Sequence, residues 1–476
     1  MRHSSLINGE WTAGSPVPNI NPSDLADVIG EYDHASLDQA ADAVASARQA
    51  FPAWSMSPVQ ARSQMLETVG LEILARKTEL ADLLAREEGK TLADALGEVV
   101  RAGQIFKFFA GEAVRIHGES LSSTRPGLEV QVTREPLGVI TLVTPWNFPI
   151  AIPAWKVAPA LAYGNCVILK PAELTPGCAW ALADIIQRAG FPPGVFNLIM
   201  GSGSRLGPKL MAPGVDAVSF TGSVQVGGAI LALAAENRLK VQLEMGGKNP
   251  LLVLDDADLD LAARVAFDGA YIATGQRCTA SSRLIVQDSV YDAFLARLTG
   301  ILNAQTVDDA RKPGVTIGPV VDASQLAADL DYVEVARNEG GRIVTGGERL
   351  QRGTAGFYMD PALIADTTPA MRINREEVFG PVASVVRVKD YEEGLSLAND
   401  TEFGLCAGIC TTSLKHASHF RRAAQAGMVM VNLPTAGVDY HVPFGGRKGS
   451  SYGPREQGAY AAEFYTTVKT HYINAG

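Results

Sequence analysis

The 476-residue sequence has few cysteines, no run of basic residues and no long apolar stretch. Its five cysteines include no Cys-x-x-Cys pair and have no framework spacing, which argues against structural zinc and against disulfides. No segment approaches the roughly 20 apolar residues that span a bilayer, and the N-terminal residues lack the apolar centre of a signal peptide. The net charge of −10 disfavours nucleic acids and anionic membranes as partners. We therefore expect a cytoplasmic protein with reduced thiols and no bound metal.

The chain is too long for one ordinary hydrophobic core, so two or three domains are expected. The first hundred residues read as helices. Ser36 and Gln39 have capping-box spacing, and apolar residues then recur at 40, 44, 47 and 51 on one helical face.

Short apolar runs that alternate with helical patterns begin after residue 137. The first series lies at 139–144, 166–171, 196–201 and 217–222, and the second at 251–256, 283–288, 341–347 and 381–388. Such runs indicate parallel sheets covered on both faces, which bind ligands at the carboxyl ends of their strands. Residues 128–136 and 463–473 instead alternate between apolar and polar, as in a solvated antiparallel strand or an edge that pairs with another subunit.

Cys278, in the loop-like stretch GQRCTA, differs from the other four cysteines, which lie among apolar or small residues. A thiolate is a nucleophile, and the neighbouring Arg277 offers a positive charge that would lower the pKa of the thiol. The alternative interpretation is a buried, inert cysteine.

Two polar residues at strand ends are candidates for chemistry. Asn147, in TPWNFP, could donate to a developing oxyanion, or it could simply form a turn. Glu244, in LEMGGKNP, could be a general base with a raised pKa, or an exposed loop acid.

Other strand ends suggest a nucleotide site. Lys170 and Glu173 could bind the hydroxyls of an adenosine ribose, or form a solvated ion pair. Thr221, Gly222 and Ser223 end an apolar run before a helical pattern, where backbone amides attract phosphate.

Taken in order, these motifs resemble the NAD(P)-dependent aldehyde dehydrogenase superfamily over nearly the whole chain. The likeness runs from INGEW (7–11) through TPWNFP, KPAELTP, FTGS, LEMGGKNP and GQRC to EEVFGPV (376–382) and PFGGRKGS (443–450). It implies an α/β fold with two Rossmann-type parallel-sheet domains and a small β oligomerisation flap. The implied divisions are 1–125 with 138–246 for the cofactor domain, 247–462 for the catalytic domain, and 126–137 with 463–476 for the flap. Family members are usually dimers or tetramers.

The resemblance also implies a mechanism. Cys278 would attack the aldehyde to give a thiohemiacetal, whose oxyanion Asn147 and the backbone N–H of Cys278 would hold. Hydride transfer to NAD or NADP would leave a thioester, which Glu244 would hydrolyse by activating a water. Lys156 and Glu456 match positions proposed to relay protons behind that base.

The cofactor contacts follow in the same way. The implied residues are Thr144, Pro145, Trp146, Lys170, Glu173, Gly203, Phe220, Gly222, Ser223, Gly246, Glu377 and Phe379. Glu173 favours NAD, because a carboxylate near the ribose 2′ position opposes a phosphate there. Arg205 could instead help to bind such a phosphate.

The segment 432–458 is similar to that of bacterial α-ketoglutaric semialdehyde dehydrogenases, which form 2-oxoglutarate. The expected substrate-binding residues are Phe148, Trp155, Arg277, Tyr440, His441 and Phe444. Arg277 is the first candidate to bind the carboxylate of such a substrate. Succinic semialdehyde is the nearest alternative, although Trp155 and Ile272 stand where those enzymes often have arginine. A plain aliphatic or aromatic aldehyde is the third option.

Two other function classes are weaker. A hydrolase would pair Cys278 with a histidine, but none of the seven histidines lies in a recognisable partner motif. A catalytically silent relative is disfavoured because Cys278, Glu244 and Asn147 are all present. His416 and His419 have the spacing of a metal pair but read as a solvated helix face.

Overall fold

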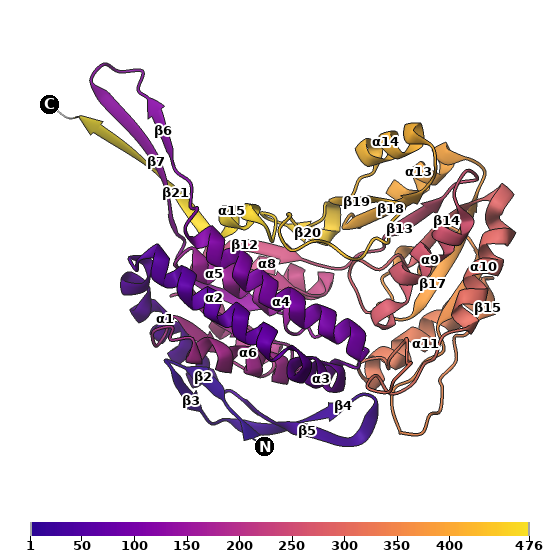
Figure 1. Ribbon diagram of the computed structural model, residues 1–476, viewed down its shortest axis with the longest axis horizontal. Helices are drawn as coiled ribbons and strands as arrows, with labels where there is room; N and C mark the ends of the chain where they lie inside the picture. Colours follow the sequence, from indigo (N-terminus) through magenta and orange to yellow (C-terminus); the bar gives the residue numbers. More distant parts are fainter. Residues whose placement is uncertain (1, 475–476) are drawn as a thin grey trace.

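The computed structural model describes residues 2–474 and has two lobes, each built around a large sheet, with a three-stranded flap that projects from the first lobe (Figure 1). All of the strands predicted between residues 139 and 388 are present. The α/β fold class expected from the sequence is therefore confirmed.

Residues 2–34 form five strands joined by turns, so the prediction that this region is helical was wrong. The strands are β1 (Arg2–His3), β2 (Ser5–Ile7), β3 (Glu10–Thr12), β4 (Ser15–Asn21) and β5 (Asp24–His34). They pair with one another and with β10 (Phe196–Leu198), which lies far along the chain. Long-range pairing of this kind leaves little local pattern in a short, polar segment.

The helical expectation holds from residue 37 onward. The helices are α1 (Leu37–Ser55), α2 (Val59–Ala75), α3 (Lys77–Glu88) and α4 (Leu92–Ala113). The capping box at Ser36 and Gln39 is present in full. Figure 1 shows α2, α3 and α4 side by side over one face of the first lobe.

The sheet of the first lobe has the order β20-β12-β11-β8-β9-β10-β2-β3. Its further strands are β8 (Val139–Val143), β9 (Cys166–Lys170), β11 (Ala217–Thr221), β12 (Lys240–Glu244) and β20 (Ser451–Tyr452). Its helices are α5 (Ala151–Ala162), α6 (Pro176–Arg188), α7 (Gly203–Leu210) and α8 (Val224–Asn237). The central strands β8 to β12 run parallel, so their carboxyl ends share one edge.

The sheet of the second lobe has the order β15-β16-β17-β14-β13-β18-β19. Its strands are β13 (Pro250–Val253), β14 (Arg283–Gln287), β15 (Arg342–Thr345), β16 (Ala362–Thr367), β17 (Val382–Val388), β18 (Cys406–Cys410) and β19 (Met428–Val431). Its helices are α9 (Leu259–Ala270), α10 (Tyr291–Asn303), α11 (Ala323–Asn338), α12 (Arg372–Arg375), α13 (Tyr391–Asn399) and α14 (Leu414–Ala423). Only β15 runs antiparallel to its neighbour within this described sheet.

The flap consists of β6 (Glu119–Ser122), β7 (Leu128–Pro136) and β21 (Thr466–Asn474), which follows the short helix α15 (Ala462–Tyr465). β21 pairs with β7 antiparallel along its whole length, which is one of the two arrangements that the alternating pattern allowed, but residues 463–465 of that pattern lie in α15. Residues 475 and 476 of the expected flap lie outside the described residues. The division of the chain into domains stays a prediction.

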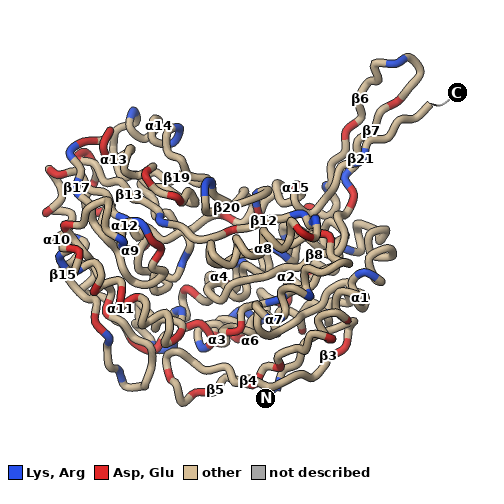
Figure 2. The backbone as a smooth tube through the Cα atoms, turned by 180° about the vertical axis from the view of Figure 1, so that it is seen from behind, with Lys and Arg blue, Asp and Glu red and all other residues tan. Residues whose placement is uncertain are grey.

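The surface carries charges of both signs. Figure 2 shows basic and acidic residues interspersed along both lobes and the flap. Within residues 2–474, no helix has the length and apolar character needed to cross a membrane.

Candidate active site

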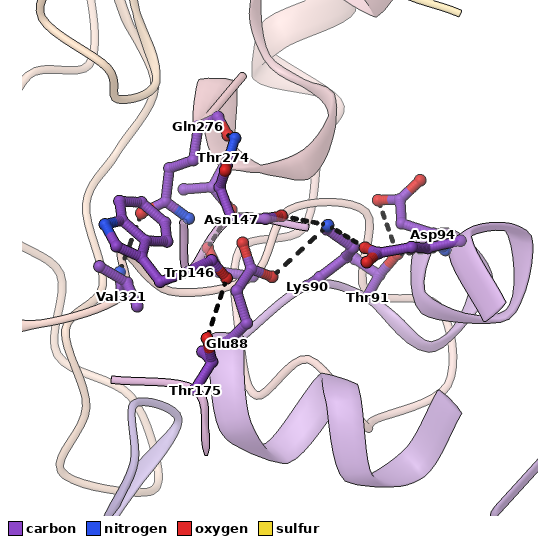
Figure 3. Close-up of polar contacts among 12 residues, drawn as sticks. Glu88, Lys90, Thr91, Asp94, Trp146, Asn147, Thr175, Thr274, Gln276 and Val321 are labelled. Carbon is purple, nitrogen blue, oxygen red and sulfur yellow. Dashed lines mark hydrogen bonds and ion pairs between the residues drawn. The ribbon is translucent and has the colours of Figure 1, made fainter. Parts of the chain in front are cut away.

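The loop after β8 holds Asn147 in a buried position at the edge where the parallel strands end. Lys90 holds this loop in place, because its ammonium donates to the backbone carbonyl of Asn147 at 2.7 Å (Figure 3). The same ammonium donates to Glu98 at 2.7 Å. The other oxygen of Glu98 accepts the backbone N–H groups of Ile150 and Ala151 at 3.1 Å. The start of α5 and the Asn147 loop are therefore tied to the same buried ion pair.

The loop that carries Cys278 has a strained backbone. Ala273 and Thr274 have positive φ angles of 54° and 56°, which is unfavourable for residues with a Cβ. Polar contacts hold this conformation: Thr274 donates to the carbonyl of Gly318 at 3.2 Å, and the side chain of Asn249 donates to the carbonyl of Cys278 at 2.8 Å. Strain that surrounding contacts maintain is typical of functional sites.

Asn147 meets the Cys278 loop directly. Its side-chain Nδ2 donates to the backbone carbonyl of Gln276 at 2.9 Å, as Figure 3 shows. The side chain of Gln276 in turn accepts the backbone N–H of Val321 at 2.9 Å. The structure therefore joins the Asn147 side chain to the loop that carries Cys278, although the two are far apart in the sequence.

The surroundings of Cys278 favour the protonated thiol over the thiolate. Burial raises the pKa of the Cys278 thiol well above its usual range, and the carboxylates of Glu377 and Glu244 raise it further. Arg277, the neighbouring charge that could lower this pKa, does not offset the effects of burial and of the two acids. A base must therefore take the proton as the thiol reacts.

Glu244 is the last residue of β12 and is buried, as expected for a general base. Its carboxyl accepts a hydrogen bond of 2.5 Å from Ser451. Burial raises the pKa of Glu244 well above its ordinary value, and Glu456 raises it further.

A buried polar chain lies behind Glu244. Lys156 and Glu456 form an ion pair, and Lys156 also donates to Ser219 at 2.7 Å. Ser219 donates to Gln242 at 2.9 Å. One oxygen of Glu456 has no hydrogen-bond partner within residues 2–474. This arrangement agrees with the proton-relay role implied for Lys156 and Glu456.

The carboxyl ends of the first sheet present groups that fit a dinucleotide. Thr144 directly follows β8, and Thr221 is the last residue of the neighbouring strand β11. The hydroxyls of both residues are buried and have no hydrogen-bond partner in the described chain. Ser223 caps α8 by accepting the backbone N–H of Val226 at 3.3 Å, so the first amides of this helix are available to phosphate. A Cβ at Gly222 would lie 2.5 Å from the ring of Phe220, so this turn requires glycine.

Lys170, Glu173 and Gly203 lie together, as the resemblance implied. Glu173 is exposed and accepts the backbone N–H of Gly203 at 3.3 Å. Lys170 is the last residue of β9, and burial lowers its pKa to about 8. Gly203 begins α7, and Arg205 lies within this helix.

Glu377 and Phe379 approach from the second lobe. Glu377 accepts the backbone N–H of Gly247 at 2.8 Å, and burial raises the pKa of its carboxyl to about 7. A Cβ at Gly246 would lie 2.1 Å from Glu377, so glycine is needed there. The ring of Phe379 meets that of Trp146, beside Pro145, edge-on at 5.4 Å.

The profile of the aldehyde dehydrogenase family matches residues 11–471. The chain belongs to this family. It is 42% identical over 476 residues to an alpha-ketoglutarate semialdehyde dehydrogenase of Haloferax volcanii, covering 98% of both chains. An alpha-ketoglutaric semialdehyde dehydrogenase of Bacillus subtilis is also 42% identical, with 98% of this chain and 97% of the relative covered. The crystal structure of an NAD-dependent aldehyde dehydrogenase from Sinorhizobium meliloti matches with a TM-score of 0.97 at 36% identity, covering 100% of this chain and 95% of that one.

The protein is therefore an aldehyde dehydrogenase that uses NAD or NADP. Family membership favours this activity over a cysteine hydrolase. His416 and His419 lie on α14 against Tyr391, one stacked on its ring and the other 2.7 Å from its hydroxyl. Among residues 2–474, no group of three or more His, Cys, Asp or Glu side chains could hold a metal ion.

The expected substrate-binding residues are only partly gathered around Cys278. Phe444 packs in the same apolar cluster as Cys278, and its ring lies 5.4 Å from that of Trp155. Phe148 follows Asn147 in the same loop, and the ammonium of Lys90 lies 3.8 Å from its ring centroid. His441 is exposed, and its neighbour Tyr440 packs edge-on against Phe108 of α4.

The guanidinium of Arg277 turns toward the end of α9. It donates to the backbone carbonyls of Asp268 and Gly269, the second at 3.1 Å. Burial lowers the pKa of Arg277 to about 10. Arg277 is thus held in place by α9, with part of its guanidinium still available to a ligand.

Several residues that shape the site had no recognisable signal in the sequence. They hold the Asn147 loop or contact Glu244: Lys90, Glu98 and Ser451. Lys90 precedes α4, and Glu98 lies within it, 8 residues further along the chain. They are therefore not the i, i+3 or i, i+4 neighbours that pair on the surface of a helix.

Proposed function

We propose that the enzyme oxidises α-ketoglutaric semialdehyde to 2-oxoglutarate. The observation that carries this proposal is the 42% identity, over essentially the full chain, to two relatives named for that activity. The buried, adjoining Cys278 loop, Asn147 and Glu244 supply the groups that such an oxidation needs. Succinic semialdehyde and simple aldehydes are the alternative substrates.

In this proposal the thiol of Cys278 loses its proton to solvent water, and the resulting thiolate adds to the aldehyde carbon to give a thiohemiacetal. An amide has two N–H donors, and Asn147 uses one of them on the carbonyl of Gln276. The second N–H stabilises the oxyanion, together with the backbone N–H of Cys278. The bound nicotinamide supplies the hydride acceptor.

Glu244 then removes a proton from the water that hydrolyses the Cys278 thioester. Its proton passes toward Glu456 and Lys156, which lie behind it in the buried polar chain. The products are the free thiol and the carboxylic acid.

The residues at the strand ends are proposed to hold the cofactor. Ser223 and the first amides of α8 bind the pyrophosphate, and Glu377 and Phe379 hold the nicotinamide half. Lys170 and Glu173 bind the adenosine ribose. The exposed carboxylate of Glu173 supports a preference for NAD over NADP, because it would repel a 2′-phosphate.

We further propose a cytoplasmic homodimer or homotetramer that assembles through the flap. The edge strands β6 and β21 expose apolar side chains, including Leu121, Val468 and Tyr472, at 52%, 57% and 63% of their area. Exposed edges of this kind invite a further strand or sheet. The five unpaired thiols support a reducing compartment.

Purified enzyme mixed with NAD or NADP and a panel of aldehydes tests the proposal, with the absorbance of reduced nicotinamide as the readout. We expect the highest kcat/KM with α-ketoglutaric semialdehyde, a lower value with succinic semialdehyde and the lowest with butanal. A highest value with butanal would contradict the proposed substrate.

A further inference from the structure

A cluster of three hydrogen-bond donors lies in contact on α4, α5 and the segment after β20. The guanidinium of Arg101 lies 5.8 Å from the ring centroid of Trp155. Its Nη2 donates to Oε1 of Gln457 at 3.2 Å. We refer to Arg101, Trp155 and Gln457 as the donor cluster.

Each member of the donor cluster has a buried N–H group with no acceptor among residues 2–474. These groups are Nε of Arg101, Nε1 of Trp155 and Nε2 of Gln457. Buried donors in proteins are nearly always paired, because an unpaired one loses its hydrogen bonds to water without replacement. Three unpaired donors on touching side chains therefore indicate a ligand that brings several acceptor oxygens.

The charge of the donor cluster favours an anion. The acids that act on Arg101 are Glu98 and Asp439, yet neither forms an ion pair with it in the described part of the chain. Glu98 is committed to Lys90 and to two backbone N–H groups, and Asp439 is exposed. Arg101 is therefore a half-buried cation with no ion-pair partner among residues 2–474, an arrangement that an anionic ligand would stabilise.

Ring contacts connect the donor cluster to the nucleophile. Trp155 packs against Phe444 at 5.4 Å between ring centroids, and Phe444 packs in the same apolar cluster as Cys278. Two aromatic rings thus link the donor cluster to the apolar cluster beside the thiol. Gln457 has a φ of +61°, a strained value for a side-chain-bearing residue, and it follows Glu456 of the polar chain directly.

We propose that the donor cluster binds the carboxylate of the substrate while the aldehyde carbon of the same molecule reaches Cys278. This inference rests on the proposed function, since it requires an aldehyde with an acid group at its far end. A planar guanidinium pairs well with a carboxylate, and Trp155 and Gln457 supply further donors to its two oxygens. The donor cluster takes the main carboxylate-binding role that was expected of Arg277 from the sequence, because it gathers three unpaired donors, whereas Arg277 donates twice to α9 and keeps one donor, Nε, unpaired in the described chain.

Kinetics with charged and uncharged aldehydes test this inference. Arg101→Met is expected to lower kcat/KM for α-ketoglutaric and succinic semialdehydes by about 30-fold or more, mainly through KM, and to affect butanal several-fold less. Trp155→Phe keeps the ring and removes only the N–H, so it should show the same selectivity at about 3- to 10-fold. Arg277→Met is the matched control, which removes an equal charge near Cys278 and should not reproduce this selectivity.

Product binding separates this inference from the proposed function. Added 2-oxoglutarate should raise the melting temperature of the wild-type enzyme and raise that of the Arg101→Met variant far less. Equal losses for butanal and for both semialdehydes, or equal stabilisation of both proteins by 2-oxoglutarate, would overturn the role of the donor cluster. A wild-type enzyme that prefers butanal but is stabilised by 2-oxoglutarate only when Arg101 is present would contradict the proposed substrate and retain the binding site.

Discussion

Nδ2 of Asn147 donates a hydrogen bond of 2.9 Å to the backbone carbonyl of Gln276, two residues before Cys278. This bond joins the strand end of β8 in the first lobe to the loop that precedes β14 in the second. Because Lys90 holds the backbone of Asn147 at the same time, the amide has little freedom to move away from the thiol.

Asn147→Ala should lower kcat by about 100- to 1,000-fold, the usual effect of removing one oxyanion donor. The loss should fall on kcat more than on KM, because the oxyanion forms only in the transition state. Alkylation of Cys278 by iodoacetamide is the control. A normal alkylation rate shows that the thiol remains accessible, and an unchanged kcat would contradict the oxyanion role.

Glu244→Gln should stop turnover after the thioester has formed. Rapid mixing with NAD and substrate should then release close to one equivalent of reduced nicotinamide per active site, followed by a slow steady state. Wild-type enzyme should turn over without such a stop. A variant that turns over at the wild-type rate would remove Glu244 as the general base.

The pH dependence of kcat should follow the carboxyl of Glu244. Its pKa is raised, so the neutral form persists to higher pH than in an ordinary glutamate, and kcat should rise as the pH rises through that pKa. Glu456 contributes to raising it, so Glu456→Gln should move the rising limb to lower pH. A limb that does not move would show that Glu456 does not act on the base.

Glu173→Ser should raise kcat/KM with NADP relative to NAD by about tenfold or more. The variant removes the carboxylate that opposes a 2′-phosphate, a change worth at least about 1.4 kcal/mol at close range. Arg205→Ala is the companion variant. It should lower the use of NADP only if its guanidinium helps to bind that phosphate.

Lys90→Met should destabilise the first lobe, because it leaves Glu98 buried without its cation, a loss of about 3–5 kcal/mol. The measurement is the melting temperature, which should fall by several degrees. The double variant Lys90→Met with Glu98→Gln removes both charges and should recover part of the loss. An unchanged melting temperature in the single variant would contradict a structural role for this ion pair.

The sequence predicted the parts of the fold in which local pattern and tertiary environment agree. The strands β8, β9 and β11 are apolar throughout because helices cover both faces of their sheet, so their burial is visible in the residues themselves. β4, with the sequence SPVPNIN, is polar and mostly exposed, and it is a strand because it pairs with β5. This pairing leaves no alternation of apolar and polar residues in the sequence of β4 itself.

The site shows the same division. Cys278, Glu244 and Asn147 stand in distinctive motifs, so the resemblance identified them. The structure then brings Asn147 to the Cys278 loop. Arg101 occupies one position in the middle of an amphipathic helix, where an arginine is unremarkable. Its partners Trp155 and Gln457 lie 54 (155 − 101) and 356 residues away, so only the folded chain reveals their contact.

The ion pair between Lys156 and Glu456 also bears on how the enzyme folds. It closes a loop of 300 residues, and β20 joins the edge of the first sheet only after the whole second lobe has been made. Contacts of such large sequence separation are slow to form. The first lobe therefore completes its sheet only after a segment near the end of the chain has been made, and a shortened chain that lacks this segment has no Glu456 to pair with Lys156.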